Sequence, residues 1–279
     1  MRHVTCLTGF AIAIMMLSAA ANGQACGSYE KFIKNSLKYC VSESREKTFI
    51  LLDGSDGFSG RSKEWVQQNI FNNKKIIWSK EGSEITVARL GSKSVADMDM
   101  VKICTPKHES QIDFWDAPGK VKRDNALVHC SLSNVADEFL SDPTQANRSS
   151  LVEAVAEVFK NPRYNFSNSE AQGVGRKFFF ISDLFQNSRN ISFHKLCKVD
   201  ISMDMLRCPS FDDLVSENVK VKRYLSEAIP RLNKLDEIHI YNINVSNRID
   251  QSARDFWEEY FVEAGADITN IFYRAELDG

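Results

Sequence analysis

Several features that would assign a chemistry directly are missing from this sequence. It has no Cys-x-x-Cys pair, no paired-histidine spacing of a zinc site, and no Gly-x-Ser-x-Gly elbow of a serine hydrolase. The 279 residues carry a formal net charge of −2, so the basic field that non-specific nucleic-acid binding needs is lacking. Beyond an N-terminal apolar run, no segment has the length and apolarity to cross a bilayer. Zinc enzymes, serine hydrolases and nucleic-acid binders are therefore disfavoured.

The N-terminal apolar run has the three-part plan of a secretory signal. A basic start at Arg2 precedes a mostly apolar stretch over 4–17, and small residues follow up to Ala25. We therefore predict a signal peptide over 1–25 and an exported protein, either periplasmic or secreted. Attachment to a membrane is expected only if the signal remains uncleaved.

The cysteines of the mature chain predict disulfides. Removing residues 1–25 removes Cys6 and leaves six of the seven cysteines. An even number in an exported chain favours disulfides over free thiols. Six cysteines allow many pairings, and proximity in sequence alone suggests three short loops. The predicted pairs are Cys26 with Cys40, Cys104 with Cys130, and Cys197 with Cys208.

Apolar runs of strand length alternate with segments of helical periodicity along the chain. This alternation predicts an α/β fold in three layers, a doubly wound, mostly parallel sheet with helices on both faces. We expect one domain over 26–279. Aromatic residues in the last helix recur at helical spacing, which predicts core packing rather than a binding platform. Strands are expected over 48–52, 83–90 (half-buried), 100–104, 178–181, 237–245 and 267–273, and helices over 28–40, from Ser59 or Ser62 to about 73, and over 126–140, 151–159, 211–232 and 252–264, with a loop over 107–124.

Two of the apolar runs end in carboxylates and hydroxyls. The run over 48–52 leads into Asp53 and Ser55, and the run over 177–181 leads into a Ser-Asp pair that ends at Asp183. In open α/β sheets, ligands bind in the crevice beyond the carboxyl ends of the strands. Carboxylate and hydroxyl oxygens there would suit a hard cation. The alternative is that each aspartate only caps the turn or helix after its strand.

The order of these motifs resembles the von Willebrand factor type A (vWA) domain and its metal-ion-dependent adhesion site (MIDAS). That site has Asp-x-Ser-x-Ser on a first loop, a threonine on a second and an aspartate on a third. Asp53 and Ser55 match the first loop, Ser149 stands in place of the threonine, and Asp183 matches the third loop. The resemblance implies that these four residues hold Mg²⁺ or Mn²⁺.

Two positions depart from the vWA pattern. Gly57 stands where the second serine ligand would be, and Ser149 replaces the threonine. Asp56 is the candidate for an additional ligand that replaces the missing oxygen. Water is the alternative, because Mg²⁺ keeps several waters in many protein sites.

A closer resemblance is to a bacterial, exported subgroup of type A-like proteins. It covers nearly the whole mature chain, from about 48 to 274. The motifs that carry it, taken together in order, are Asp53-Gly-Ser55-Asp56, Cys104-Thr-Pro106, Ser182-Asp-Leu-Phe-Gln-Asn-Ser188 and Phe256-Trp-Glu-Glu-Tyr-Phe261.

The resemblance implies a non-enzymatic module that binds a protein partner. An acidic side chain of that partner would complete the coordination of the metal ion. One alternative is a metal-dependent hydrolase or phosphatase that uses the same cleft. Phosphatases of the haloacid dehalogenase type, however, need a second aspartate where this chain has Ser55. Another alternative is a structural envelope protein whose metal site has decayed.

Overall fold

The computed structural model describes most of the chain beyond its N-terminal region. The predicted signal peptide over 1–25 lies outside the described residues, as do Cys26 and Asp56. The described residues are 33–34, 36–37, 40, 46–55, 57–73, 77, 82–91, 95–106, 117–141, 149–164, 166, 175–200, 205–234, 236–243 and 250–276.

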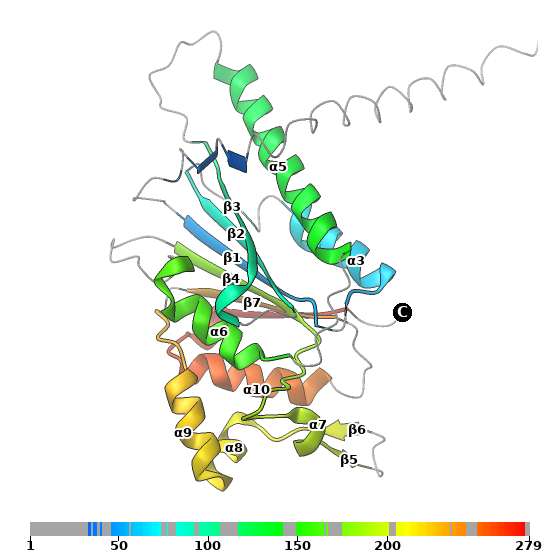
Figure 1. The fold of residues 1–279 in the computed structure, drawn as a ribbon, viewed down its shortest axis with the longest axis vertical. Helices are drawn as coiled ribbons and strands as arrows, with labels where there is room; N and C mark the ends of the chain where they lie inside the picture. Colours follow the sequence, from blue (N-terminus) through cyan, green and yellow to red (C-terminus); the bar gives the residue numbers. More distant parts are fainter. Residues whose placement is uncertain are drawn as a thin grey trace, which may run out of the picture.

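A six-stranded, mostly parallel sheet forms the centre of the molecule (Figure 1). Its strands are β1 (Glu46–Asp53), β2 (Glu84–Leu90), β3 (Asp99–Cys104), β4 (Gly175–Ser182), β7 (Glu237–Asn242) and β8 (Ile271–Ala275). They lie in the order β3-β2-β1-β4-β7-β8. The edge strand β3 is antiparallel to β2, and the other neighbours are parallel. The chain thus builds one half of the sheet outward from β1, returns to the centre for β4, and builds the other half outward.

Helices cover both faces of this sheet (Figure 1). They are α3 (Gly60–Val66), continued by the π-helical η2 (Gln67–Phe71), α5 (Ala117–Ser141), α6 (Leu151–Lys160), α8 (Phe211–Glu217), α9 (Val219–Ala228) and α10 (Asp250–Glu263). Ile50 and Leu52 of β1 belong to the core with α3 and α5, whereas Phe49 and Leu51 belong to the core with α6 and α10. Successive strand residues point to opposite faces, so both faces of β1 are buried. The predicted α/β class with helices on both faces is confirmed.

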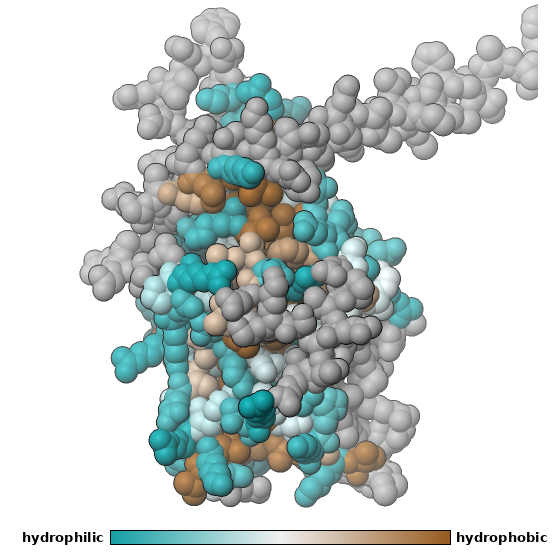
Figure 2. Space-filling model, in the orientation of Figure 1, coloured by the Kyte–Doolittle hydropathy of each residue, from teal (hydrophilic) through white to brown (hydrophobic). Residues whose placement is uncertain are grey.

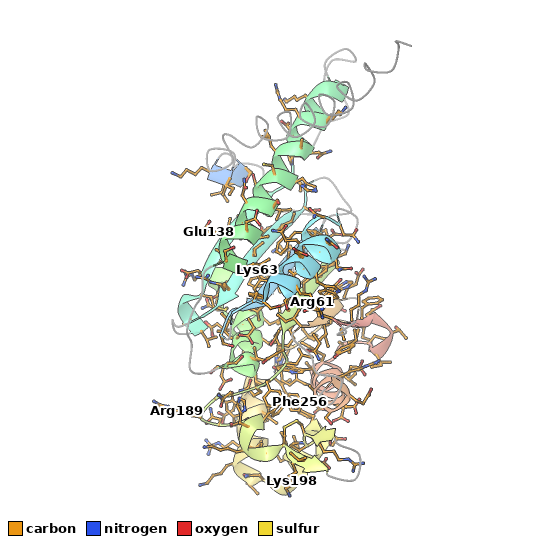
Figure 3. All side chains as sticks on the ribbon, turned by 90° about the vertical axis from the view of Figure 1, so that its right-hand side faces the viewer. Arg61, Lys63, Glu138, Arg189, Lys198 and Phe256 are labelled. Carbon is orange, nitrogen blue, oxygen red and sulfur yellow. A yellow bond between two sulfur atoms is a disulfide. The ribbon has the colours of Figure 1, made fainter. Side chains whose placement is uncertain are left out.

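Aromatic side chains fill the core beneath α10. Phe180 of β4 meets Trp257 edge to face, with ring centroids 4.7 Å apart, and Phe178 meets Phe261 at 6.2 Å. Phe256, labelled in Figure 3, lies among these packed side chains and is fully buried. Edge-to-face contacts of this kind add to the stabilisation from burial. The predicted role of these residues in core packing is confirmed.

Strand β2 is buried along its whole length, so the prediction of a half-buried strand was wrong. The cause is its position between β1 and β3, where helices cover both faces. Its polar side chains therefore need partners within the protein. Glu84 forms an ion pair with Lys102 at 2.8 Å, and Arg89 donates to the carbonyl oxygen of Phe139 at 3.4 Å.

Helix α5 begins at Ala117, so the predicted loop over 107–124 was wrong from there onward. Residues 107–116 lie outside the described residues. Pro118 falls in the first turn, where its missing N–H removes no helical hydrogen bond. Although α5 has 25 residues, no helix in the described part of the chain is long and apolar enough to span a membrane.

Short elements follow β4 and flank the remaining strands. They are α7 (Phe193–Leu196), the antiparallel pair β5 (Lys198–Asp200) and β6 (Met205–Arg207), and the 3₁₀ turns η3 (Val95–Asp97), η4 (Pro162–Tyr164) and η5 (Ile268–Asn270). The predicted Cys197–Cys208 disulfide is confirmed and closes the β5–β6 hairpin. Figure 2 shows small hydrophobic patches at the end of the molecule that carries α9 and this hairpin. Val219 of α9 and Val199 of β5 are exposed.

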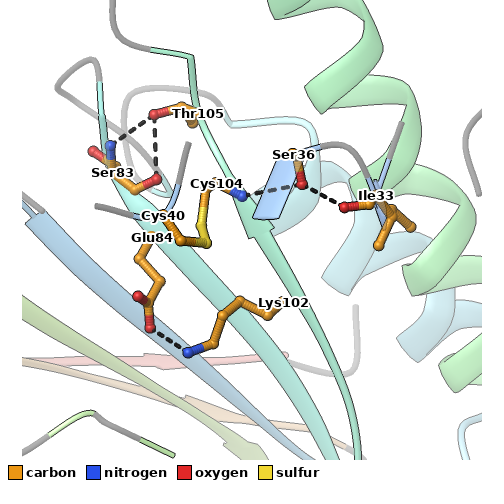
Figure 4. Close-up of a disulfide and its surroundings, with 8 residues drawn as sticks. All are labelled: Ile33, Ser36, Cys40, Ser83, Glu84, Lys102, Cys104 and Thr105. Carbon is orange, nitrogen blue, oxygen red and sulfur yellow. Dashed lines mark hydrogen bonds and ion pairs between the residues drawn. A yellow bond between two sulfur atoms is a disulfide. The ribbon is translucent and has the colours of Figure 1, made fainter. Parts of the chain in front are cut away.

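The second described disulfide joins Cys40 to Cys104, with Cα atoms 5.3 Å apart (Figure 4). The predicted pairs Cys26–Cys40 and Cys104–Cys130 were therefore wrong, although Cys130 is also disulfide-bonded. Proximity in sequence failed as a guide because the end of β3 carries Cys104 to the segment that contains Cys40, 64 positions earlier.

Glu84 lies close to this disulfide, but the group is not a metal site. The two sulfur atoms are bonded to each other, so neither offers the thiolate that binds a metal. The Glu84 carboxylate is neutralised by Lys102 (Figure 4).

Candidate functional site

The carboxyl ends of β1 and β4 lie side by side at the middle of the sheet. β1 ends at Asp53 and β4 at Ser182, and Leu52 pairs with Ile181 one residue earlier. The strands that follow β1 in sequence, β2 and β3, lie on one side of it, whereas β4 and the later strands of the sheet lie on the other side. The strand order thus reverses between β1 and β4. In open α/β sheets such a reversal leaves a crevice in which ligands bind. Asp53 and Asp183 are thus brought to one edge of the sheet, as the sequence predicted.

Two serine hydroxyls converge on the carboxylate of Asp53. Ser149 Oγ donates to Asp53 Oδ2 at 2.7 Å, and Ser182 Oγ donates to the same oxygen at 2.8 Å. All three side chains are buried. Ser149 lies just before Ser150, the N-cap residue of α6, so three separate segments of the chain meet here. Sequence reasoning placed Ser149 in the site but missed Ser182, although the Ser-Asp ending of β4 was the available signal.

The loop after β1 folds back over Asp53. The backbone N–H of Ser55 donates to Asp53 Oδ1 at 3.1 Å, and the Ser55 hydroxyl also bonds to this carboxylate. Gly57 closes the turn with a bond from its N–H to the carbonyl of Gly54 at 3.2 Å. Its φ is +73°, a conformation in which a serine would be strained. The backbone of this turn therefore favours glycine at position 57.

Burial dominates the electrostatics of Asp53. Removal from water raises the pKa of its carboxyl group, and the hydrogen bonds from Ser149, Ser55 and Ser182 only partly oppose that rise. In the described part of the chain, no lysine, arginine or histidine forms an ion pair with Asp53. The site therefore holds a buried carboxylate whose charge a cation would stabilise.

Asp183, which is only partly buried, adjoins the same cluster. Its Oδ1 accepts the N–H of Phe185 at 2.9 Å and lies 3.4 Å from Ser182 Oγ, so the serine connects the two carboxylates. The next residue, Leu184, is fully buried with a φ of +63°. Its N–H donates to Ser182 Oγ at 2.9 Å. Backbone strain of this kind clusters at functional sites and switch regions.

Gln186 ties the Asp183 loop to the start of α6. Its side chain is fully buried, with Oε1 accepting the N–H of Val152 at 2.8 Å and Nε2 donating to Glu153 at 3.1 Å. The N–H of Asn187 donates to the carbonyl of Ser149 at 2.6 Å. These bonds hold the second and third loops of the site at a set separation. Sequence reasoning noted Gln186 only as part of a family motif and missed this positioning role.

The chemistry of the cluster fits a hard cation. Its candidate metal ligands are the carboxylate oxygens of Asp53 and Asp183 and the hydroxyl oxygens of Ser55, Ser149 and Ser182. An all-oxygen set of this kind suits Mg²⁺ or Mn²⁺ rather than a softer metal. Asp56, the candidate for an additional ligand, lies outside the described residues.

Comparison with known proteins gives distant structural neighbours alone. No family model and no curated protein matches the sequence. Two crystal structures of the pilus adhesin SpaC from Lactobacillus rhamnosus GG, one of them in an open conformation, are similar to 83% of this chain at 10% identity. Their TM-scores are 0.38 and 0.33. The chain spans 28% of the length of these adhesins.

Proposed function

We propose that this chain is an exported, vWA-like binding module in which Asp53, Ser55, Ser149 and Asp183 hold Mg²⁺ or Mn²⁺. The observation that carries the proposal is the convergence of two hydroxyls on the buried Asp53 carboxylate. Three segments far apart in sequence supply these groups. An arrangement that only capped helices would not need a charge at this depth, since serine or asparagine caps a helix equally well.

The strand order supports the vWA-like assignment. Numbered by their order along the chain, the strands of the sheet run 3-2-1-4-5-6, which is the order of a doubly wound sheet. The cluster lies at the reversal between the first and fourth of these strands. The two described disulfides support export, because disulfides persist in oxidising compartments.

The proposed activity is binding of a protein partner rather than catalysis. A bound Mg²⁺ or Mn²⁺ would supply a positive centre that an acidic side chain of the partner can bind. In this scheme Ser149, Ser182 and the Ser55 loop orient the Asp53 carboxylate and exclude water from it. In the described part of the chain, no histidine, lysine or cysteine contacts Asp53 as a partner for acid–base catalysis.

Calorimetric titration of Mg²⁺ and of Mn²⁺ into the oxidised protein tests the proposal. We expect saturable binding that is lost in Asp183→Asn and retained in Asp212→Asn, which removes an exposed carboxylate of α8. Absence of heat and of a thermal shift at millimolar metal would refute the metal site. Metal-dependent hydrolysis of a generic phosphomonoester, lost in Asp183→Asn, would instead favour the hydrolase.

A further inference from the structure

A second candidate binding site lies at the opposite end of the sheet. An open cavity of about 890 Å³ is bordered by Arg176 at the start of β4, the loop over 229–234, and the carboxyl ends of α6, α9 and α10. Arg176 and Ser182 lie at opposite ends of β4, about 20 Å apart at the rise of a strand. The cavity is therefore separate from the Asp53 cluster.

The charged side chains described in the cavity lining are all positive, although the carboxyl ends of the three helices carry partial negative charge. Four of the described lining residues are cations, namely Lys160, Arg176, Arg231 and Lys234, and none of the described lining residues is acidic. Two of these cations have structural partners. Arg176 forms a buried ion pair with Asp236, and Lys160 donates to a main-chain carbonyl of α9.

Arg231 has no such partner among the described residues, and Lys234 interacts only electrostatically with the carboxylate of Asp267, which does not line the cavity. Both side chains are exposed, and within the described residues neither side chain forms a hydrogen bond or an ion pair. Partial burial lowers the pKa of Lys160, so its ammonium group also lacks full solvation. Cations gathered around one cavity attract anions, and Arg in particular matches the oxygens of carboxylates and phosphates.

The loop that carries these two cations is held rigidly. Asp236 accepts the N–H of Asn233 at 2.8 Å while it bonds to Arg176, also at 2.8 Å. The N–H of Leu232 donates to the carbonyl of Ala264 at 2.8 Å. Gly265 allows this approach, because its φ is +106° and a Cβ there would lie 3.0 Å from the Leu232 carbonyl oxygen. The cavity is thus pre-organised, which lowers the entropy cost of binding.

Apolar side chains complete the lining beside the cations. Phe159, Ile229 and Leu232 border the same cavity, and its volume is within the range of small-molecule sites. A carboxylate offers a single charge, whereas a phosphomonoester carries about −1.5 to −2 at neutral pH. We propose that this cavity binds a small organic molecule through a phosphomonoester group, with Arg231 and Lys234 as its principal contacts.

Binding of glycerol 3-phosphate to the oxidised protein, measured by calorimetry, tests this inference. We expect saturable binding that weakens about tenfold in Arg231→Gln and in Lys234→Gln, the effect of losing one charge-assisted contact in each. Lys220→Gln, which removes an exposed cation at the start of α9, should bind like the wild type. Lactate, a monocarboxylate of similar size, should bind more weakly than glycerol 3-phosphate.

Vesicles of phosphatidylcholine with phosphatidic acid form a second arm, which distinguishes a lipid headgroup from a soluble ligand. Cosedimentation with these vesicles that is lost in Arg231→Gln and Lys234→Gln would assign the phosphate to a lipid. Failure of both probes to bind would overturn the inference. So would equal binding by the Arg231→Gln, Lys234→Gln double variant and Lys220→Gln, or equal affinity for lactate.

Discussion

Replacing Asp53 with asparagine should separate the metal-binding role of this residue from a structural role. The exchange removes the charge but keeps the shape, and the amide oxygen can still accept the N–H of Ser55. Ser182 Oγ retains Asp183 Oδ1 at 3.4 Å as a second acceptor. Ser149 is therefore the residue that loses its acceptor.

The expected change in stability follows from two opposing effects. A hydrogen bond to a charged group contributes about 1.5–3 kcal/mol, and burying an ion costs several kcal/mol. The raised pKa of Asp53 indicates that the cost of burial outweighs the hydrogen bonds. In EDTA at neutral pH, we therefore expect Asp53→Asn to be as stable as the wild type or up to about 1 kcal/mol more stable.

Adding Mg²⁺ should reverse this order. A ligand at 100 times its Kd stabilises the folded state by about 2.7 kcal/mol, and only the wild type should show this gain. Urea denaturation with and without Mg²⁺ measures both quantities, and Asp212→Asn serves as the control for loss of an exposed carboxylate. The metal-binding role would be refuted if Asp53→Asn were more than about 2 kcal/mol less stable than the wild type in EDTA and Mg²⁺ did not stabilise the wild type. Asp53 would then serve only as a hydrogen-bond acceptor.

The same reasoning fixes a pH dependence for the metal-free protein. The pKa of Asp53 is higher in the folded state than in the unfolded state, where it is near 3.8. The contribution of Asp53 to folding stability is therefore fully present below the unfolded pKa and is lost as pH rises through the folded pKa. The stability advantage of Asp53→Asn over the wild type should accordingly grow as pH rises from below the unfolded pKa to neutrality. An advantage that shrinks with rising pH would contradict the assigned burial effect.

Three further predictions concern stability. Asp236→Asn leaves Arg176 as an uncompensated buried charge and should cost about 3–5 kcal/mol in urea denaturation, whereas a cost below about 1 kcal/mol would mean that the pair is solvated. Tyr260→Phe removes a buried hydroxyl with no hydrogen-bond partner in the described structure, so it should be neutral or up to about 1 kcal/mol stabilising. Burial raises the pKa of Tyr260, so the variant should also lose less stability than the wild type at pH values above 10.0, where an unfolded tyrosine ionises. Replacing Cys40 and Cys104 together by serine should cost about 4 kcal/mol from loop entropy, and an unchanged midpoint would argue against this pairing.

The sequence was sufficient to predict the order and type of most elements. The apolar run before Asp53 and the one before Asp183 are parallel strands of one sheet, as expected. Two local predictions were wrong because a short stretch of sequence does not show which other elements pack against it. Alternating residues in β2 indicated an exposed face that other elements cover, and Pro118 indicated a loop where the structure has the first turn of α5.

Local sequence patterns determined the α/β class, because apolar runs and helical periodicities are properties of neighbouring residues. They also placed Asp53 and Asp183 in one candidate site, through the rule that parallel strands end at one edge of a sheet. Ser149 was assigned to that site only through the resemblance to the vWA pattern. Only the tertiary structure identified the Cys40–Cys104 disulfide, the hydrogen bonds of Gln186 and the basic cavity. Each of these joins segments that are distant in sequence, and such contacts depend on how strands and helices pack, which no local pattern encodes.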